Sequence, residues 1–302
     1  MKQKLSQIEN KLLSQPCNQV ERISLFPGIE LFYFSTTSNT VTINHSKWGD
    51  ILEINYCKSG RIGWKMENGN QIYLGPGDFS LHTLDSCTNS TIYFPNGSYE
   101  GLTLCIDLTE VKKHQPEILP DVQTGIDVLY EKFCKNGSIS SFAGTPKTDS
   151  IFSGFYGQQT NLKLAYQKLK SLELLLYLIK MRINESGQLT EYKSELVEIV
   201  HSIHMQLTKN IGKRITIEEL SMQYAVNPTT LKKVFKSVYG NSLAAHIKEH
   251  RMELASQLLR ETDIGIAEIG QKVGYESQSK FSAAFKSHFK ILPREYRKLT
   301  KK

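Results

Sequence analysis

The sequence lacks both a long hydrophobic run and an apolar leader. Its longest apolar stretch, residues 174–179, is much shorter than the roughly 18–20 residues that a membrane-spanning helix needs. The first thirteen residues carry Lys, Gln and Glu where a signal peptide would be apolar. We therefore expect a cytoplasmic protein with no membrane partner.

Cysteine is scarce, and its spacing does not suit a metal site or a disulfide framework. The five cysteines are an odd number, and none of them forms a C-x-x-C pair: Cys17, Cys57, Cys87, Cys105 and Cys134. We interpret them as small buried hydrophobic residues in a reducing compartment, with a thiol sensor as the alternative.

The excess positive charge is confined to one end of the chain. At 302 residues the chain is longer than one core usually organises, so we expect two domains. From Met205 onward there are 18 Lys+Arg and 9 Asp+Glu, whereas the preceding residues hold 19 and 21. A basic module joined to a nearly neutral one suggests that one end meets a polyanion. A solvated Lys-rich surface is the alternative.

Short β-rich runs separated by turn residues fill the chain from Ile29 to Asp107. They recur about every ten residues, and Asn68-Gly69 is a strong hairpin signal. Such spacing predicts a small sandwich or barrel. A barrel of this size is either a packed core or a holder for one small ligand.

A long helix is predicted from Asn161 to Arg182. Apolar residues recur along it at alternating steps of three and four: Leu162, Ala165, Leu169, Leu172, Leu176 and Ile179. Packing against the barrel explains this stripe about as well as self-association does. Leu174, Leu175 and Leu178 widen the apolar face, which suits a helix that contacts both the barrel and a second subunit in a homodimer.

The C-terminal third contains one pattern twice, about fifty residues apart. Each copy has a short helix, a break of three or four residues and a second helix, which is the helix-turn-helix layout. The correspondence pairs Ile217 with Ile266, Leu220 with Ile269, Leu231 with Phe281, and Phe235-Lys236-Ser237 with Phe285-Lys286-Ser287.

Local signals define the ends of these helices. Thr216-x-x-Glu219 is a capping box, Asn227-Pro228 starts the next helix, and Gly240 stops it. In the second copy Gly274 permits the turn and Ser277 caps the second helix. The connecting helix, residues 243–259, is roughly 25 Å long. That length can hold the two second helices apart by something close to the ~34 Å between successive major grooves on one face of DNA.

The second copy closely resembles the signature of AraC/XylS-type transcription regulators. The matching residues are Ala267-Glu268-Ile269-x3-Val273-Gly274-Tyr275-Glu276-Ser277-Gln278-Ser279-Lys280-Phe281-x3-Phe285-Lys286-x6-Pro293-x2-Tyr296-Arg297, and Lys290 stands where many members have Gly. With the upstream copy the resemblance covers about 95 residues. It implies a seven-helix unit with two helix-turn-helix motifs, and the region from Ile29 to Asp107 looks like the cupin-type sensing barrel that many such regulators carry.

Base contacts are expected from the second helix of each motif. In the first motif the candidates lie off the apolar face: Thr229, Thr230, Lys232 and Lys233. In the second motif the residues at the start of the helix or at the family's base-reading positions are Gln278, Ser279, Lys280 and Ala283. Lysine can donate to guanine and Gln can pair with adenine, whereas Ala offers only a methyl contact. For each lysine a phosphate contact or a contribution to solubility is the alternative.

Five further cations are assigned to DNA-backbone positioning or to pairing within the domain. They are Lys236, Lys286, Arg251, Arg294 and Arg297.

The first domain is expected to sense rather than to catalyse. No Gly-rich phosphate loop, nucleophile elbow or paired catalytic carboxylates occur in it. The H-x-H pair of metal-binding cupins is also absent, because Lys47 stands two residues after His45. We expect no metal and no cofactor. Candidates for contacts with an unknown small-molecule effector are His45, Trp48, Glu53, Tyr56, Trp64 and His82.

The sequence therefore predicts an α+β, non-enzymatic regulator in two domains. Residues 1–183 would form a cupin-like β-barrel with following helices, residues 184–194 a linker, and residues 195–302 an all-α DNA-binding domain. The resemblance implies an effector-responsive activator that binds double-stranded promoter DNA and RNA polymerase. An effector-independent regulator and a metal or thiol sensor are the alternatives.

Overall fold

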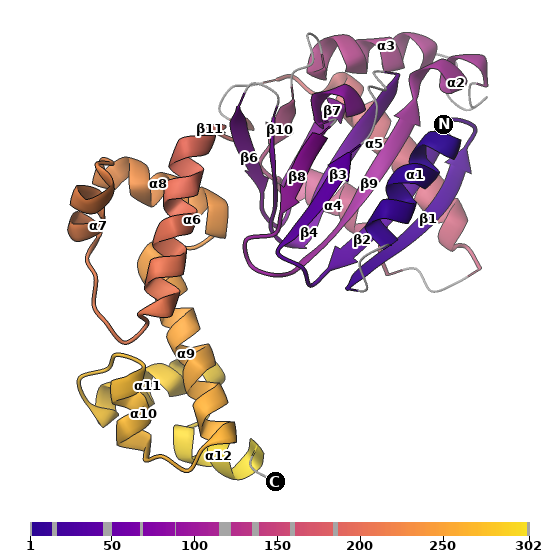
Figure 1. Cartoon of the computed structure of the whole chain (residues 1–302). Helices are drawn as coiled ribbons and strands as arrows, with labels where there is room; N and C mark the ends of the chain where they lie inside the picture. Colours follow the sequence, from indigo (N-terminus) through magenta and orange to yellow (C-terminus); the bar gives the residue numbers. More distant parts are fainter. Residues whose placement is uncertain are drawn as a thin grey trace. The chain divides into compact units, whose positions relative to one another are not determined.

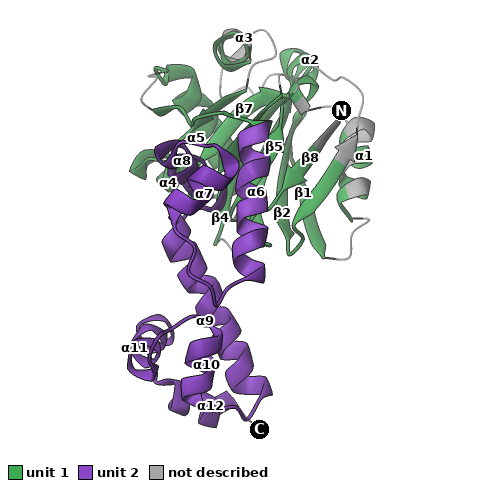
Figure 2. Cartoon of the chain, turned by 60° about the vertical axis from the view of Figure 1, so that its left-hand side comes forward, with its two compact units in different colours: residues 1–194 green, residues 195–302 purple. Residues whose placement is uncertain are grey.

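The chain forms two compact units, Met1–Ser194 and Glu195–Lys302, shown in different colours in Figure 2. This computed structural model describes residues 2–13, 17–44, 50–66, 69–87, 89–114, 122–134, 139–157, 161–183 and 187–300. None of the helices in this described part is long and apolar enough to cross a membrane. Figure 1 gives the order of the elements.

The first unit contains two antiparallel sheets. One has six strands in the order β1 (Asn18–Phe26), β2 (Ile29–Thr36), β9 (Tyr99–Asp107), β4 (Ile51–Gly60), β7 (Phe79–Thr83) and β10 (Ser140–Phe142). The other has five, in the order β11 (Tyr192–Lys193), β6 (Asn70–Leu74), β5 (Ile62–Lys65), β8 (Asn89–Tyr93) and β3 (Thr40–Asn44).

The predicted α+β class is confirmed, but the strands do not close into one barrel. Within the described residues, the named strands pair only inside each sheet. The outermost strands of the larger sheet are β1 and β10, and β10 also pairs with residues 187–189. Short alternating strands are common to sandwiches and barrels, so the sequence pattern could not separate the two.

Strand alternation gives the six-stranded sheet two different faces. Leu52, Ile54 and Tyr56 of β4 belong to a core shared with residues of helices on one side. Glu53 and Asn55, between them in sequence, line a cavity on the other side. Because successive side chains of a strand point to opposite faces, one strand supplies both the core and the cavity wall.

Helices cover the apolar face of this sheet. The core includes Phe133, Phe152 and Leu175, which come from three of them. The helices of the first unit are α1 (Lys2–Leu13), α2 (Leu108–Lys113), α3 (Val122–Phe133), α4 (Pro146–Ser153) and α5 (Lys163–Lys180), with a short 3-10 helix at Leu84–Cys87. The helix expected from Asn161 to Arg182 is thus present as α5.

The second unit is built from seven helices. They are α6 (Ser194–Lys209), α7 (Ile217–Tyr224), α8 (Pro228–Tyr239), α9 (Leu243–Glu261), α10 (Ile266–Lys272), α11 (Gln278–Phe289) and α12 (Pro293–Thr300). The pairs α7–α8 and α10–α11 are the two helix-turn-helix motifs, and α9 connects them (Figure 1).

The predicted helix caps are confirmed. The Thr216 hydroxyl accepts from the Glu219 amide at 3.2 Å, and the Glu219 carboxylate accepts from the Thr216 amide at 2.7 Å. Asn227 Oδ1 accepts from the Thr229 amide at 2.9 Å. Gly240 ends α8 with a φ of 85°, a left-handed conformation that glycine adopts without steric cost. Helices α7 and α8 therefore begin, and α8 also ends, where the sequence predicts.

Lys290 occupies the equivalent position after α11 with a φ of 66°. A residue with a side chain loses about 1–2 kcal/mol of stability in the left-handed conformation. Glycine avoids this cost, but it loses more conformational entropy on folding, which offsets part of the gain. We expect Lys290→Gly to raise the free energy of unfolding of the second unit by about 0.5–1 kcal/mol. Amide hydrogen exchange in α11 and α12 measures this change. Gly240→Ala is the matched control and should lower the same quantity, whereas a loss of stability in Lys290→Gly would contradict the account.

Candidate nucleic-acid interface

Helix α8 presents its predicted base-reading residues on its exposed side. Leu231, Val234, Phe235, Val238 and Tyr239 are buried. Thr229, Lys232, Lys233 and Lys236 are exposed, and Thr230 is half-buried. The amphipathic pattern thus separates the side that packs from the side that is free to meet a ligand.

Helix α11 repeats this arrangement with fewer cations. Phe281 and Phe285 are buried, whereas Gln278, Ser279, Lys280, Ala283 and Lys286 are exposed. The Lys280 ammonium lies 2.6 Å from a Glu276 carboxylate oxygen, and this hydrogen bond lowers the pKa of Glu276. Lys280 therefore has an acidic partner within its own motif.

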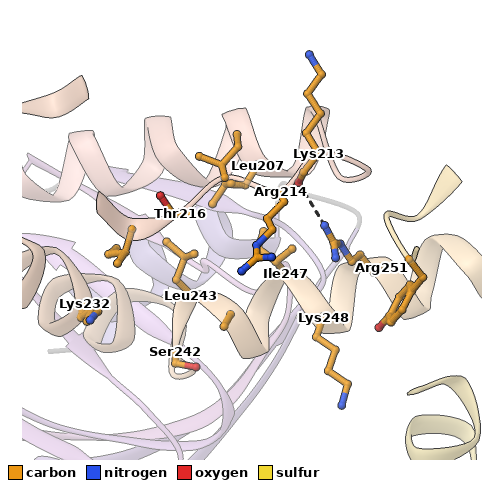
Figure 3. Close-up of a pocket in the computed structure, with 14 residues that line it drawn as sticks. Leu207, Lys213, Arg214, Thr216, Lys232, Ser242, Leu243, Ile247, Lys248 and Arg251 are labelled. Atoms are coloured by element: carbon orange, nitrogen blue, oxygen red, sulfur yellow. Dashed lines mark hydrogen bonds between the residues drawn. The ribbon is translucent and has the colours of Figure 1, made fainter. Parts of the chain in front are cut away.

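A basic groove of about 430 Å³ lies beside the first motif (Figure 3). Its walls come from the α6–α7 connection, from α8 and from the beginning of α9. Five of its fourteen lining residues are cations, and none is acidic: Lys213, Arg214, Lys232, Lys248 and Arg251.

The first turn of α9 also contributes to this groove. Ser242 caps the helix by accepting from the Ala245 amide at 3.3 Å. Helix N-termini carry partial positive charge and unpaired amides, so they attract anions. In Figure 3 Arg214 extends toward α9, while Lys213 and Lys248 extend outward. The groove therefore offers a cationic surface of the kind that binds phosphate groups.

Arg251 joins the two motifs by donating to three backbone carbonyls. Its guanidinium bonds to Ile211 at 3.0 Å and to Lys213 at 3.2 Å, both before the first motif, and to Gly274 at 3.3 Å in the turn of the second. It also lies 5.9 Å from the centre of the Tyr275 ring. A Cβ added at Gly274 would come within 2.7 Å of the Arg251 side chain, so glycine is required for this approach.

The five cations expected to position the DNA backbone or to pair within the domain thus separate into two groups. Arg251 is committed to intradomain hydrogen bonds, and Arg297 donates to the Ile264 carbonyl at 2.7 Å. Lys236, Lys286 and Arg294 are exposed. Sequence reasoning missed three groove cations, Lys213, Arg214 and Lys248. The available signal was the Lys213-Arg214 pair just before the Thr216 capping box.

Some of the expected effector contacts lie together in the first unit. Glu53 lines a cavity of about 110 Å³ whose walls are mostly apolar, with Asn55 and Thr103 as further polar members. His82 Nε2 is 3.4 Å from a Glu53 oxygen, and the His82 ring is 5.6 Å from that of Trp64. Glu53, His82 and Trp64 therefore form one neighbourhood, of which Glu53 lines the cavity.

Tyr56 lies on the opposite face of β4. Its ring stacks on Phe152 of α4 with centroids 4.2 Å apart, inside the helix-covered core. His45 and Trp48 lie outside the described residues. The described strands therefore bring together only part of the expected effector set.

The buried cysteines are chemically quiet. Cys57, Cys105 and Cys134 are free and buried. Burial raises the pKa of Cys57 and of Cys134 to about 12, and that of Cys105 well above its usual value. A protonated thiol is a poor nucleophile, so these three cysteines suit packing better than redox sensing.

The second unit is similar to parts of known proteins. Residues 220–299 match a helix-turn-helix domain family. The transcriptional regulator AlkR of Acinetobacter baylyi is 33% identical over 115 residues, which are 37% of this chain and 38% of AlkR. The multiple antibiotic resistance protein MarA of Escherichia coli is 29% identical over 98 residues, 32% of this chain and 77% of MarA.

Among solved structures, the C-terminal domain of AraT, a response regulator from Geobacillus stearothermophilus, has 31% identity and a TM-score of 0.34. The match covers 34% of this chain and 87% of that domain. The similarity to AlkR, by comparison, spans little more than a third of each of the two proteins.

Arg251→Lys should loosen the joint between the motifs. A lysine keeps the charge but cannot reach three carbonyls in a fixed fork, so we expect a loss of about 2–3 kcal/mol in the opening free energy of α9. Amide hydrogen exchange measures it. Arg260→Lys on the same helix is the control, because Arg260 bonds to Ser256 and Tyr296 without reaching the first motif. Equal, small effects of both substitutions would refute this role.

Proposed function

We propose, from the AraC-type helix-turn-helix DNA-binding domain in its second unit, that this chain is a transcriptional regulator of promoter DNA. In this proposal α8 and α11 enter two adjacent major-groove segments of one duplex. The observation that carries it is the pair of capped helices with exposed polar faces, held on one connecting helix beside a groove with five cations.

The length of α9 suits this arrangement. Its 19 residues span about 28 Å at 1.5 Å per residue, near the ~34 Å between successive major grooves on one face of B-DNA. Hydrogen bonds from Arg251 at the middle of this helix restrain the segment before the first motif and the turn of the second. A preformed pair of reading helices avoids the entropic cost of ordering them on the DNA.

The exposed side chains divide into residues that would contact base edges and residues that would bind the phosphate backbone. Thr229, Thr230, Lys232 and Lys233 would contact base edges in one groove segment, and Gln278, Ser279, Lys280 and Ala283 would do so in the next. Lys236, Lys286 and Arg294 would bind phosphates, as would Lys213, Arg214 and Lys248 of the groove. The second motif carries a lysine tied to Glu276 and an alanine, so it would discriminate less than the first.

Substitutions in α8 test this division. Lys232→Ala and Lys233→Ala should relax base preference at individual positions, with a loss of about 1–3 kcal/mol for a bidentate contact. Lys236→Ala, the matched change one turn further along the helix, should weaken binding to all sequences evenly and reduce the salt slope by about one. Selection from a random duplex library, followed by affinities at several salt concentrations, measures both effects.

The same uniform loss of affinity in all three lysine variants would refute the division into base-contacting and phosphate-binding residues. A specific affinity that does not fall with salt would refute the electrostatic part of the proposal.

The first unit would supply the regulatory input. We propose that a small effector with an apolar body and a hydrogen-bond donor occupies the cavity beside Glu53, and that it favours one presentation of the DNA-binding unit over another. In that scheme the protein acts in the cytoplasm, contacts RNA polymerase as an activator, and catalyses no reaction.

Thermal denaturation of the full chain with metabolite, metal and oxidant panels tests the effector proposal. At least one small molecule should raise the melting temperature of the wild type and of Glu100→Gln, but not of Glu53→Gln. Glu100 is the control because it pairs with Lys58 outside the cavity. No stabilisation by any compound would favour an effector-independent regulator. Stabilisation by a metal that Glu53→Gln abolishes would favour a metal sensor in the first unit, and stabilisation by oxidants alone would favour a thiol sensor.

We also propose that α5 pairs with its copy in a second chain. One face of α5 is buried, with Leu174, Leu175 and Leu178 at 1% exposure or less. In the expected stripe, Leu162 just before the helix, Leu169 and Leu176 are 55%, 59% and 41% exposed. Leu172 is 7% exposed and Ile179 packs against the core of its own unit. The helix therefore has an inner face for its own core and an outer row of leucines seven residues apart, which is the row that we propose meets a second helix.

Leu169→Glu should convert a dimer into a monomer. A carboxylate in the centre of the stripe would be desolvated without a partner on association. Sedimentation equilibrium measures the mass. Leu164→Glu is the matched control, because Leu164 is 45% exposed on the same helix but outside the stripe. A monomeric wild type, or equal effects of both changes, would contradict this proposal.

A further inference from the structure

Three histidines meet inside the second unit, behind α8. His204 comes from α6, and His246 and His250 come from consecutive turns of α9. Among the described residues they form a group in which one ring nitrogen from each lies within 4.8 Å of the others. The Nε2 atoms of His246 and His250 are 3.1 Å apart. Two lone-pair-bearing nitrogens at this distance repel each other unless a proton or a cation lies between them.

The surroundings of this cluster orient its rings. His250 Nδ1 lies 3.2 Å from a Glu253 carboxylate oxygen. A hydrogen bond from Nδ1 to a carboxylate fixes the tautomer in which Nε2 carries the lone pair, as in the carboxylate–histidine–metal arrangement. The His250 Nε2 therefore faces its two neighbours in the form that binds a cation.

Aromatic rings enclose the other two histidines. The His204 ring stacks on Tyr239 with centroids 4.5 Å apart, and the His246 ring lies 5.4 Å from Phe235. The rings of His204 and His246 also lie 5.5 Å and 4.6 Å from that of His250. Packing therefore holds the three imidazoles together.

We propose that His204, His246 and His250 bind a divalent transition-metal ion of the zinc class, independently of any effector of the first unit. Imidazole suits zinc, nickel and copper, whereas magnesium and calcium take oxygen ligands. Tetrahedral zinc with bonds of about 2.0–2.1 Å places its ligand nitrogens roughly 3.3–3.4 Å apart. His246 and His250 are already near that separation, so the site closes when His204 moves toward them.

Such an ion would cross-link two helices that support the first reading helix. His204 is on α6, its two partners are on α9, and Tyr239 against His204 is the last residue of α8. Metal binding would thus fix α8 from its buried side without occupying the groove or the exposed lysines. The predicted consequence is a metal-dependent gain in the stability of the second unit.

Zinc titration of the full-length protein by calorimetry tests this site, and the visible spectrum of the cobalt-loaded protein reports its ligands. The wild type should bind one equivalent of zinc and give the cobalt absorption of a tetrahedral nitrogen-ligated site. Glu253→Gln should weaken zinc binding about 10–100-fold, the usual cost of losing an outer-shell partner. His204→Gln and His250→Gln should weaken it further, because each removes a ligand.

His288→Gln is the control, since His288 is an exposed histidine on α11. It should bind zinc as the wild type does, and magnesium should bind to none of the variants. The proposal is overturned if the wild type does not bind one equivalent of zinc, or if His204→Gln and His250→Gln bind it as tightly as His288→Gln.

Discussion

The guanidinium of Arg251 is the constraint on which the proposed two-site recognition depends. Each motif has its own apolar residues, for example Leu220 and Val234 in the first and Ile269 and Phe281 in the second. Through three carbonyls, Arg251 ties the segment before the first motif to the turn of the second, where Gly212 also lies close to Lys272 and Gly274. Charge-assisted hydrogen bonds are directional, so this joint fixes an orientation that apolar packing alone would leave loose.

The two units of the chain offer different kinds of surface to a ligand. The second is a cationic surface on a rigid frame, whose net charge of +9 from Met205 onward favours contact with a polyanion. The first is a two-faced sheet, in which β4 places Tyr56 in the core and Glu53 at a small cavity. This separation lets a ligand and a duplex bind to different elements, which is the prerequisite for coupling between two sites.

Much of the second unit was predictable, because its signals are local. The Thr216 box, Asn227-Pro228 and Ser277 each act within one helical turn, and the repeat identified both motifs. Features that join distant residues were not predictable in the same way. Charge alone could not reveal that Arg251 is bound to carbonyls, nor could spacing decide between two sheets and a closed barrel. His246 and His250 are visible as a pair four residues apart, but His204 joins them only in the folded chain.

The most direct test of the central claim is the dependence of specific affinity on the spacing between the two recognised segments. Once the operator is defined, five base pairs are inserted between its halves, which turns one half by about half a turn of the 10–10.5 bp helix. The Kd is then measured at fixed salt. If Arg251 and α9 hold the motifs as one body, affinity should fall to that of an operator with one intact half. Unchanged affinity would show that the motifs bind independently and would contradict the account.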